Sequence, residues 1–367
     1  MNIGILTYHF GTNFGGQLQC YALFKTLQKM GHNPIVVNYL PSQRTSCFID
    51  DFRKSIRFLK SDRSLYGSFA IMLFSNSMRK AFSYYQKEKL VIGPECTLEN
   101  FNYLYPNLDA LVVGSDQVWA PAHHATGAYF FNFSPKFNGK KISYAPCCAI
   151  NNVEDKYRAS IKSLLDEFSS ISVRNLETQA FVKDLVGQEV PIVADPTFLY
   201  DFCEFKSDKT PQGKYILTYI LGEEILGGHE TIISKIKREY GNIPVYSICL
   251  TSSKPHYFSW SDKTYWDLDP IDWVDFIRNA SFLYTDSFHG VVFAMKLRTP
   301  FLAYYKEIIR ASRFIDLKER YMLTNIINMP SELEGKQLKA LQPGNETYAI
   351  SESIMNESIE FIKEALL

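Results

Sequence analysis

A short stretch late in the chain, YTDSFHG at 284–290, places an acid, a hydroxyl and an imidazole at the end of an apolar run. The following residues, VVFAMKLR, have helical spacing, so the polar group marks a strand-to-helix turn. Ser287 and the backbone N–H groups of this turn, that of Gly290 included, can hold a phosphate, and His289 can neutralise it or donate a proton. The alternative interpretation is a plain helix cap beside a packed imidazole.

Charged and hydroxyl side chains also follow three other predicted strands. In VVGSDQVW, Asp116 can act as a general base toward a substrate hydroxyl, with Ser115 beside it. In SVRN, Arg174 can bind a carboxylate or phosphate through two parallel hydrogen bonds, and Arg313, after the run TPFLAYY, is a second candidate. The alternatives are a loop-bracing or helix-capping carboxylate at Asp116, a structural salt bridge at Arg174 and a surface position for Arg313.

A glycine-rich turn near the start of the chain, TNFGGQLQ, precedes a predicted helix. Gly15 and Gly16 allow a ligand to approach the backbone closely, and the unpaired N–H groups of a helix start favour an anion. Asn13 and Gln17 flank these glycines and complete the set of candidate binding residues. The motif is neither a GxGxxG nor a Walker loop, and a simple tight turn is the alternative interpretation.

The elements that must position these residues alternate between strand and helix. Up to residue 200, apolar runs such as NIGILTYHF and VPIVADPTFLY, interpreted as strands, alternate with stretches of helical periodicity. A polar segment with Pro and Gly, 201–214, separates them from a second alternating set. We therefore predict an α/β protein with two Rossmann-like domains, 1–205 and 206–345, facing a cleft, and a C-terminal helix at 346–367. Ligands of parallel sheets bind at the carboxyl ends of the strands, where the candidate residues fall.

Composition excludes several classes of protein. The 39 basic and 39 acidic residues balance, which argues against nucleic-acid binding. The 7 cysteines form no CxxC pair, and the adjacent His123 and His124 have no third ligand at a sensible spacing, so neither a disulfide framework nor a metal site is expected. We see no signal peptide and no apolar run of the ~20 residues that a membrane span needs, and we expect a cytoplasmic protein.

The segment at about 50–90 differs from the rest of the first domain. From Phe52 to Lys87 it carries eight basic side chains and one acid, interleaved with apolar residues, which predicts basic amphipathic helices. Such helices either pack on the domain with a wet basic face or lie on an anionic membrane surface as a peripheral contact. Flotation with anionic lipid vesicles distinguishes the two, because absence of binding contradicts the membrane hypothesis.

An ordered set of motifs gives the sequence a family resemblance over about residues 1–330. The motifs are NFGGQLQCYAL, LVVGSDQVW, ISYAPCCA, ISVRN, VADPTFL and TDSFHGVVFAMKLRTPF. Together they resemble the polysaccharide pyruvyl transferase family. The resemblance implies a GT-B-like arrangement with the acceptor on the N-terminal side and the donor on the C-terminal side. It also implies transfer of a pyruvyl group from phosphoenolpyruvate to two sugar hydroxyls, forming a cyclic ketal and releasing phosphate during bacterial surface-glycan assembly.

The resemblance implies roles for the candidate residues and shows one departure. His289 would be the acid or a phosphate ligand, and Asp116 the base, with the two roles open to exchange. Many members resemble RLH or RFH where this chain has Ser287-Phe288-His289, so Arg174 and Arg313 must supply the missing charge, or the donor differs. No metal or cofactor is needed, and the acceptor glycan is often lipid-linked in such pathways. Two other hypotheses stay open: a nucleotide-sugar glycosyltransferase, and a non-catalytic glycan-binding protein on the same fold.

Overall fold

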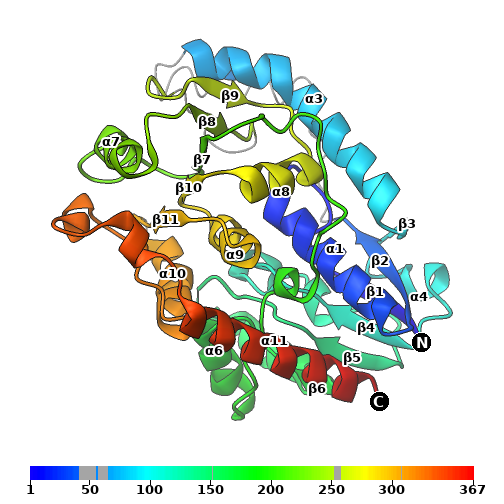
Figure 1. The fold of residues 1–367 in the computed structure, drawn as a ribbon. Coiled ribbons are helices and arrows are strands. Elements are labelled where there is room, and N and C mark those ends of the chain that lie inside the picture. Colours follow the sequence, from blue (N-terminus) through cyan, green and yellow to red (C-terminus); the bar gives the residue numbers. More distant parts are fainter. Residues whose placement is uncertain (41–54, 57–64, 151, 252–257, 307) are drawn as a thin grey trace.

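The computed structural model describes residues 1–40, 55–56, 65–150, 152–251, 258–306 and 308–367 (Figure 1). Much of the predicted basic insertion, 41–54 and 57–64, therefore lies outside the described residues. The remainder of that insertion forms one long helix, α3 (Leu65–Lys89), as its periodicity predicts.

Two parallel sheets organise the described chain. The first contains β1 (Asn2–Leu6), β2 (Asn33–Tyr39), β3 (Ile92–Cys96), β4 (Ala110–Val113), β5 (Lys140–Ser143) and β6 (Ser170–Ile171), in the order β3-β2-β1-β4-β5-β6. The second contains β7 (Ile216–Tyr219), β8 (Val245–Ile248), β9 (Lys263–Tyr265), β10 (Phe282–Thr285), β11 (Phe301–Tyr304) and β12 (Ile326–Ile327). Its order, β12-β11-β10-β7-β8-β9, repeats that of the first sheet, and in each sheet the order reverses beside the first strand. Ligands of such sheets bind at that reversal.

Helices connect and cover the strands of each sheet. The first unit contains α1 (Phe14–Lys29), α3, α4 (Phe101–Leu104), α5 (Asp155–Leu165) and α6 (Leu176–Val186). The second contains α7 (His229–Tyr240), α8 (Pro270–Asn279), α9 (Phe288–Leu297) and α10 (Ile308–Arg320). The last helix, α11 (Asn345–Leu366), runs back along the first unit (Figure 1), where Ser358 Oγ accepts a hydrogen bond of 2.8 Å from the backbone N–H of Ala194.

The structure corrects several predicted elements. The segment VPIVADPTFLY is no strand of the sheet: Ile192 forms an isolated bridge with Val173, and Pro196–Leu199 is a 3-10 turn, η3. The two prolines of this segment lack the N–H that a sheet ladder needs, which explains the error. Five helices and strands, β3, α4, β9, β12 and α10, were not predicted. The domain boundary at residue 205 stays a prediction.

The two units share one apolar core beneath the candidate site. Phe14, the first residue of α1, stacks on Trp273 of α8 with ring centroids 5.5 Å apart, and both side chains are buried. Phe82 of α3 and Tyr219 of β7 pack against the same Phe14 ring. Phe14 therefore joins three helices and a strand from both halves of the chain.

Truncating Phe14 is expected to destabilise the whole molecule. Phe14→Ala should lower the free energy of unfolding by about 3–5 kcal/mol, because the cavity between α1 and α8 cannot collapse without moving one unit against the other. Phe14→Leu, which keeps most of the volume, should cost only about 1 kcal/mol for the lost ring pairing. Urea denaturation monitored by tryptophan fluorescence measures both, and equal costs would contradict the shared-core interpretation.

Candidate active site

The turn that opens α9 has the predicted form. Ser287 is the N-cap, and its Oγ accepts a hydrogen bond of 3.2 Å from the backbone N–H of Gly290. A Cβ on Gly290 would lie 2.7 Å from Thr285 Oγ1, so only glycine fits without displacing that side chain. The Ser287 hydroxyl is thus engaged in capping, and the predicted binding of phosphate by Ser287 and Gly290 is not tested by these contacts.

Asp286 has a structural task in the same turn. Its two carboxylate oxygens accept hydrogen bonds of 2.6 Å from the backbone N–H groups of Leu221 and Gly222, in the loop after β7. These contacts fix the β7 loop against the start of α9. The loops after β7 and β10, the two strands at the reversal point of the second sheet, are therefore bonded to each other beside His289.

A buried carboxylate that we did not select from the sequence, Asp195, lies at the centre of the site. Its Oδ2 accepts hydrogen bonds from Ser115 Oγ at 3.1 Å and from Arg174 Nη1 at 3.0 Å, and it lies 3.6 Å from His289 Nε2. Burial alone would raise the pKa of Asp195, but its contacts with His289, Arg174 and Thr197 outweigh burial and hold the pKa below its ordinary value. Asp195 is therefore ionised at neutral pH and brings three predicted residues together.

Arg174 presents a free edge to the space beside this carboxylate. Only 2% of the residue is exposed, and its guanidinium stacks on the ring of Phe288, 4.6 Å from the centroid. Nη1 is occupied by Asp195 and Ser115, whereas among the described residues neither Nε nor Nη2 has a hydrogen-bond partner. Nε and Nη2 form one edge of the guanidinium, which is the fork that binds a carboxylate or phosphate with two hydrogen bonds.

His289 crosses from the second unit to the start of α1. A Cβ built on Gly15 would lie 2.0 Å from His289 Nδ1 and 2.2 Å from its Cγ, so the imidazole occupies the space that any other side chain at position 15 would fill. Gly15 is buried within the first turn of α1, with Asn13 as the N-cap accepting from the Gly16 N–H at 3.0 Å. The predicted glycine turn and the predicted histidine turn are thus in contact.

Asp116 lies beside the same helix start. It has a φ of 77°, a left-handed conformation that non-glycine residues adopt rarely, and its Oδ1 accepts a hydrogen bond of 2.8 Å from the Gln117 N–H. Its Oδ2 lies 3.5 Å from the Cβ position of Gly16. The amide of Gln17 instead donates to the carbonyls of His9 and Gly11, so its amino group holds the preceding loop.

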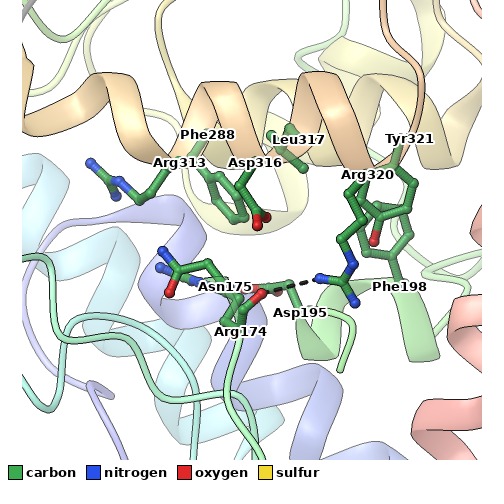
Figure 2. A pocket seen from close by; sticks show the side chains of 10 residues that line it. All are labelled: Arg174, Asn175, Asp195, Phe198, Phe288, Arg313, Asp316, Leu317, Arg320 and Tyr321. Carbon is green, nitrogen blue, oxygen red and sulfur yellow. Dashed lines mark hydrogen bonds and ion pairs between the residues drawn. The ribbon is translucent and has the colours of Figure 1, made fainter. Parts of the chain in front are cut away.

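Helix α10 closes the other side of the site (Figure 2). Arg313 and Asp316 line a cavity of about 10 Å³ together with Arg174 and Phe288. Arg320, on the same helix, donates to the carbonyl oxygens of Arg174, Val193 and Ile192 and thereby ties the second unit to the first. A cavity of this volume holds about one water molecule, so a larger anion requires its lining to open.

Eight residues that line this cavity were not among the predicted ones. They are Asn175, Asp195, Phe198, Phe288, Asp316, Leu317, Arg320 and Tyr321. Asn175 caps α6 by accepting from the Thr178 N–H at 3.2 Å, and its buried Nδ2 has no partner among the described residues. Burial raises the pKa of Asp316. Asp195 lies in the motif VADPTFL and Asn175 in the motif SVRN. Each is a capping residue type that follows an apolar run, and this pattern was the signal in the sequence for both.

The described residues offer neither a metal-binding cluster nor a membrane-spanning helix. No group of three or more His, Cys, Asp or Glu side chains in that part of the chain could hold a metal ion. None of its helices is both long enough and apolar enough to cross a membrane.

Solved structures with similar folds are distant in sequence. Arabidopsis thaliana UGT89C1 complexed with UDP-L-rhamnose has a TM-score of 0.50 and 10% identity, over 100% of this chain and 99% of that one. The spinosyn rhamnosyltransferase SpnG has a TM-score of 0.44 and 9% identity over 100% of both chains. A putative UDP-N-acetylglucosamine 2-epimerase from Listeria monocytogenes has a TM-score of 0.46 and 12% identity, over 100% and 89%.

The first of these likenesses, together with the two sheets and the terminal helix, confirms the predicted GT-B-like α/β fold. A search of curated proteins found no match. The family model of the polysaccharide pyruvyl transferases matches residues 13–305, most of the chain, which shows that the protein is a member of the polysaccharide pyruvyl transferase family of enzymes.

Proposed function

We propose that the protein transfers the pyruvyl group of phosphoenolpyruvate to two hydroxyls of a sugar in a surface polysaccharide or its lipid-linked precursor, forming a pyruvate ketal. The observation that carries this proposal is the buried Nε/Nη2 edge of Arg174, which has no hydrogen-bond partner in the described part of the chain; Arg174 and His289 both contact Asp195. A donor with a carboxylate and a phosphate needs such an edge, and the edge lies where the two units meet. Membership of the family supports the same reaction.

The proposed chemistry can be assigned to groups in the site. A proton, donated by His289 in this scheme, adds to C3 of the donor, and C2 gains oxocarbenium character. A sugar hydroxyl, deprotonated by Asp116, forms a bond to C2. The bond from C2 to the phosphate oxygen breaks, and the second hydroxyl closes the ketal in its place. The products are the ketal and inorganic phosphate. One hydroxyl proton replaces that delivered to C3, and the other leaves with phosphate or solvent.

The missing arginine of the histidine turn has substitutes in the structure. Ser287 is committed to capping α9, while Arg174 and Arg313 line the same cavity from opposite units. The Nδ2 of Asn175, which lacks a partner among the residues that the structure describes, adds a neutral donor beside them. We propose that these three side chains hold the donor, with Arg313 completing the site when α10 moves.

The acceptor would approach from the first unit, past Asp116 and the start of α1. We place the reaction in the cytoplasm, at the inner face of the membrane that carries a lipid-linked acceptor. Helix α3 supports this location, because its exposed side chains combine cations with apolar groups. They include Met72, Leu73, Lys80, Tyr84 and Lys87. Attraction of such a helix to an anionic surface is an electrostatic and apolar contact without insertion across the bilayer.

The experiment that tests the function is phosphate release from phosphoenolpyruvate by purified protein with a panel of lipid-linked and nitrophenyl glycosides. Release should depend on the acceptor, and His289→Ala should reduce it about 10²- to 10⁴-fold, as loss of a general acid does. His32→Ala, at a distant site beside the N-terminus, is the matched control and should leave the rate unchanged. No release with any acceptor, combined with tight binding of a nucleotide sugar, would replace this proposal by the glycosyltransferase alternative.

A further inference from the structure

Among the buried groups of the described chain, Asp195 is the one that joins the most candidate residues. Its side chain is 1% exposed, and its neighbours come from the loop after β4, the segment after β6 and the first turn of α9. The last of these belongs to the second unit. We propose that Asp195 is a positioning residue that orients both the anion-binding edge of Arg174 and the imidazole of His289 across the interface between the two units. This inference rests on the proposed function for its meaning in the reaction.

The carboxylate of Asp195 is itself held rigidly. Thr197 donates to Oδ1 twice, from its backbone N–H at 3.1 Å and from its Oγ1 at 2.7 Å. This leaves Oδ2 alone to face Ser115, Arg174 and His289. A carboxylate fixed through one oxygen presents the other in a single direction, which is what a group that orients two further side chains requires.

Arg174 is oriented by the position of its own partners. Because Asp195 and Ser115 take Nη1 and Phe288 covers one face of the guanidinium, the remaining Nε/Nη2 edge faces away from all three. Without the carboxylate, the guanidinium could turn Nη1 toward the cavity and lose the two-pronged edge. Asp195 thus selects which edge of Arg174 meets the donor.

The imidazole of His289 is oriented by the same oxygen. Nε2 faces Asp195, while Nδ1 lies against Gly15. A carboxylate in this direction favours the tautomer with the proton on Nε2. The other charged groups around the ring are Arg174, which contacts the same Asp195 oxygen, and two carboxylates. These are Asp116 across the start of α1 and Asp286 in the same turn, the latter already bonded to two backbone N–H groups.

Two measurements on the full chain test this inference. The first uses the unaltered protein labelled with ¹⁵N at histidine, with the His289 signals assigned by comparison with His289→Ala. The neutral ring should carry its proton on Nε2, and a neutral ring protonated on Nδ1 overturns the inference. This measurement needs neither substrate nor a variant of Asp195.

The second measurement compares Asp195→Asn with Thr197→Val, which removes one hydrogen bond to the carboxylate but keeps its charge. In Asp195→Asn, the neutral His289 ring should lose its preference for the Nε2 tautomer, because an amide N–H that replaces the carboxylate oxygen accepts no hydrogen bond. The KM for phosphoenolpyruvate should rise about tenfold as Arg174 loses its orientation. Thr197→Val should keep the Nε2 tautomer.

A purely structural ion pair gives a different pattern. Both variants would then lower the melting temperature, with the tautomer of His289 and the KM for phosphoenolpyruvate unchanged, and the inference would fail. Failure of the proposed function is distinguishable from this outcome, because it shows as absence of phosphate release by the unaltered protein. The tautomer of His289 still reports on Asp195 in that case.

Discussion

Gly15→Ala is expected to reduce kcat/KM for phosphate release by at least about 100-fold while leaving the fold intact. The new Cβ would lie 2.0 Å from His289 Nδ1, a separation that real contacts do not allow, so either the imidazole or the start of α1 must move. Displacement of a reacting group by about 1 Å costs on the order of 10²-fold in rate. Alanine at this position should not destabilise helix α1 itself. Gly15 lies in the first turn with an ordinary φ, and alanine is the better helix former.

The neighbouring glycine provides the control for this prediction. A Cβ on Gly16 would meet Asp116 Oδ2 at 3.5 Å and Asn13 at 3.7 Å, which are ordinary contacts. Gly16→Ala should therefore keep activity within a few-fold of the unaltered enzyme, although it lies in the same turn. Steady-state kinetics and thermal unfolding of both variants decide the matter. Equal activities would mean that His289 does not occupy this position during the reaction.

The sequence predicted those parts of the site that depend on local pattern. A hydroxyl followed by helical spacing indicates an N-cap, and Ser287 is one. An apolar run that ends in a charged residue indicates the carboxyl end of a strand, and Arg174 and Asp116 both lie at that edge of the first sheet. The alternation of strands and helices likewise contains enough information to identify two Rossmann-like units, because each crossover repeats the same signal.

The parts that were missed depend on contacts between segments far apart in the chain. Asp195 is recognisable as a cap before Pro196, but nothing local indicates that its other oxygen faces Arg174 and His289. Arg320 donates to three carbonyl oxygens of the first unit. This role could not be predicted, because helix α10 itself was not predicted. The strands β9 and β12 are three and two residues long, too short for a period to emerge.

Arg174→Lys is the second substitution with a large expected effect, and it separates charge from geometry. Lysine keeps one positive charge near Asp195, so the buried carboxylate retains a partner and the fold should survive. Lysine cannot, however, reproduce the Nε/Nη2 edge, nor stack on Phe288 as the planar guanidinium does. Hydrogen bonds to charged groups contribute about 1.5–3 kcal/mol each, so the KM for phosphoenolpyruvate should rise at least about 10- to 150-fold.

The same conservative exchange at an exposed arginine is the matched control. Arg158 forms a surface ion pair with Asp184 at 2.7 Å, and Arg158→Lys should change neither KM nor stability measurably. Arg313→Lys addresses a second cation of the cavity, which lies on α10. If Arg174→Lys leaves KM unchanged while Arg313→Lys raises it, the donor anion is held chiefly by α10. The free edge of Arg174 would then serve the acceptor or a bound water instead. In the other outcome, both single variants raise KM, and the double variant raises it by more than the product of the two single effects. The two arginines then bind the same anion from opposite units, because each one alone can partly replace the other.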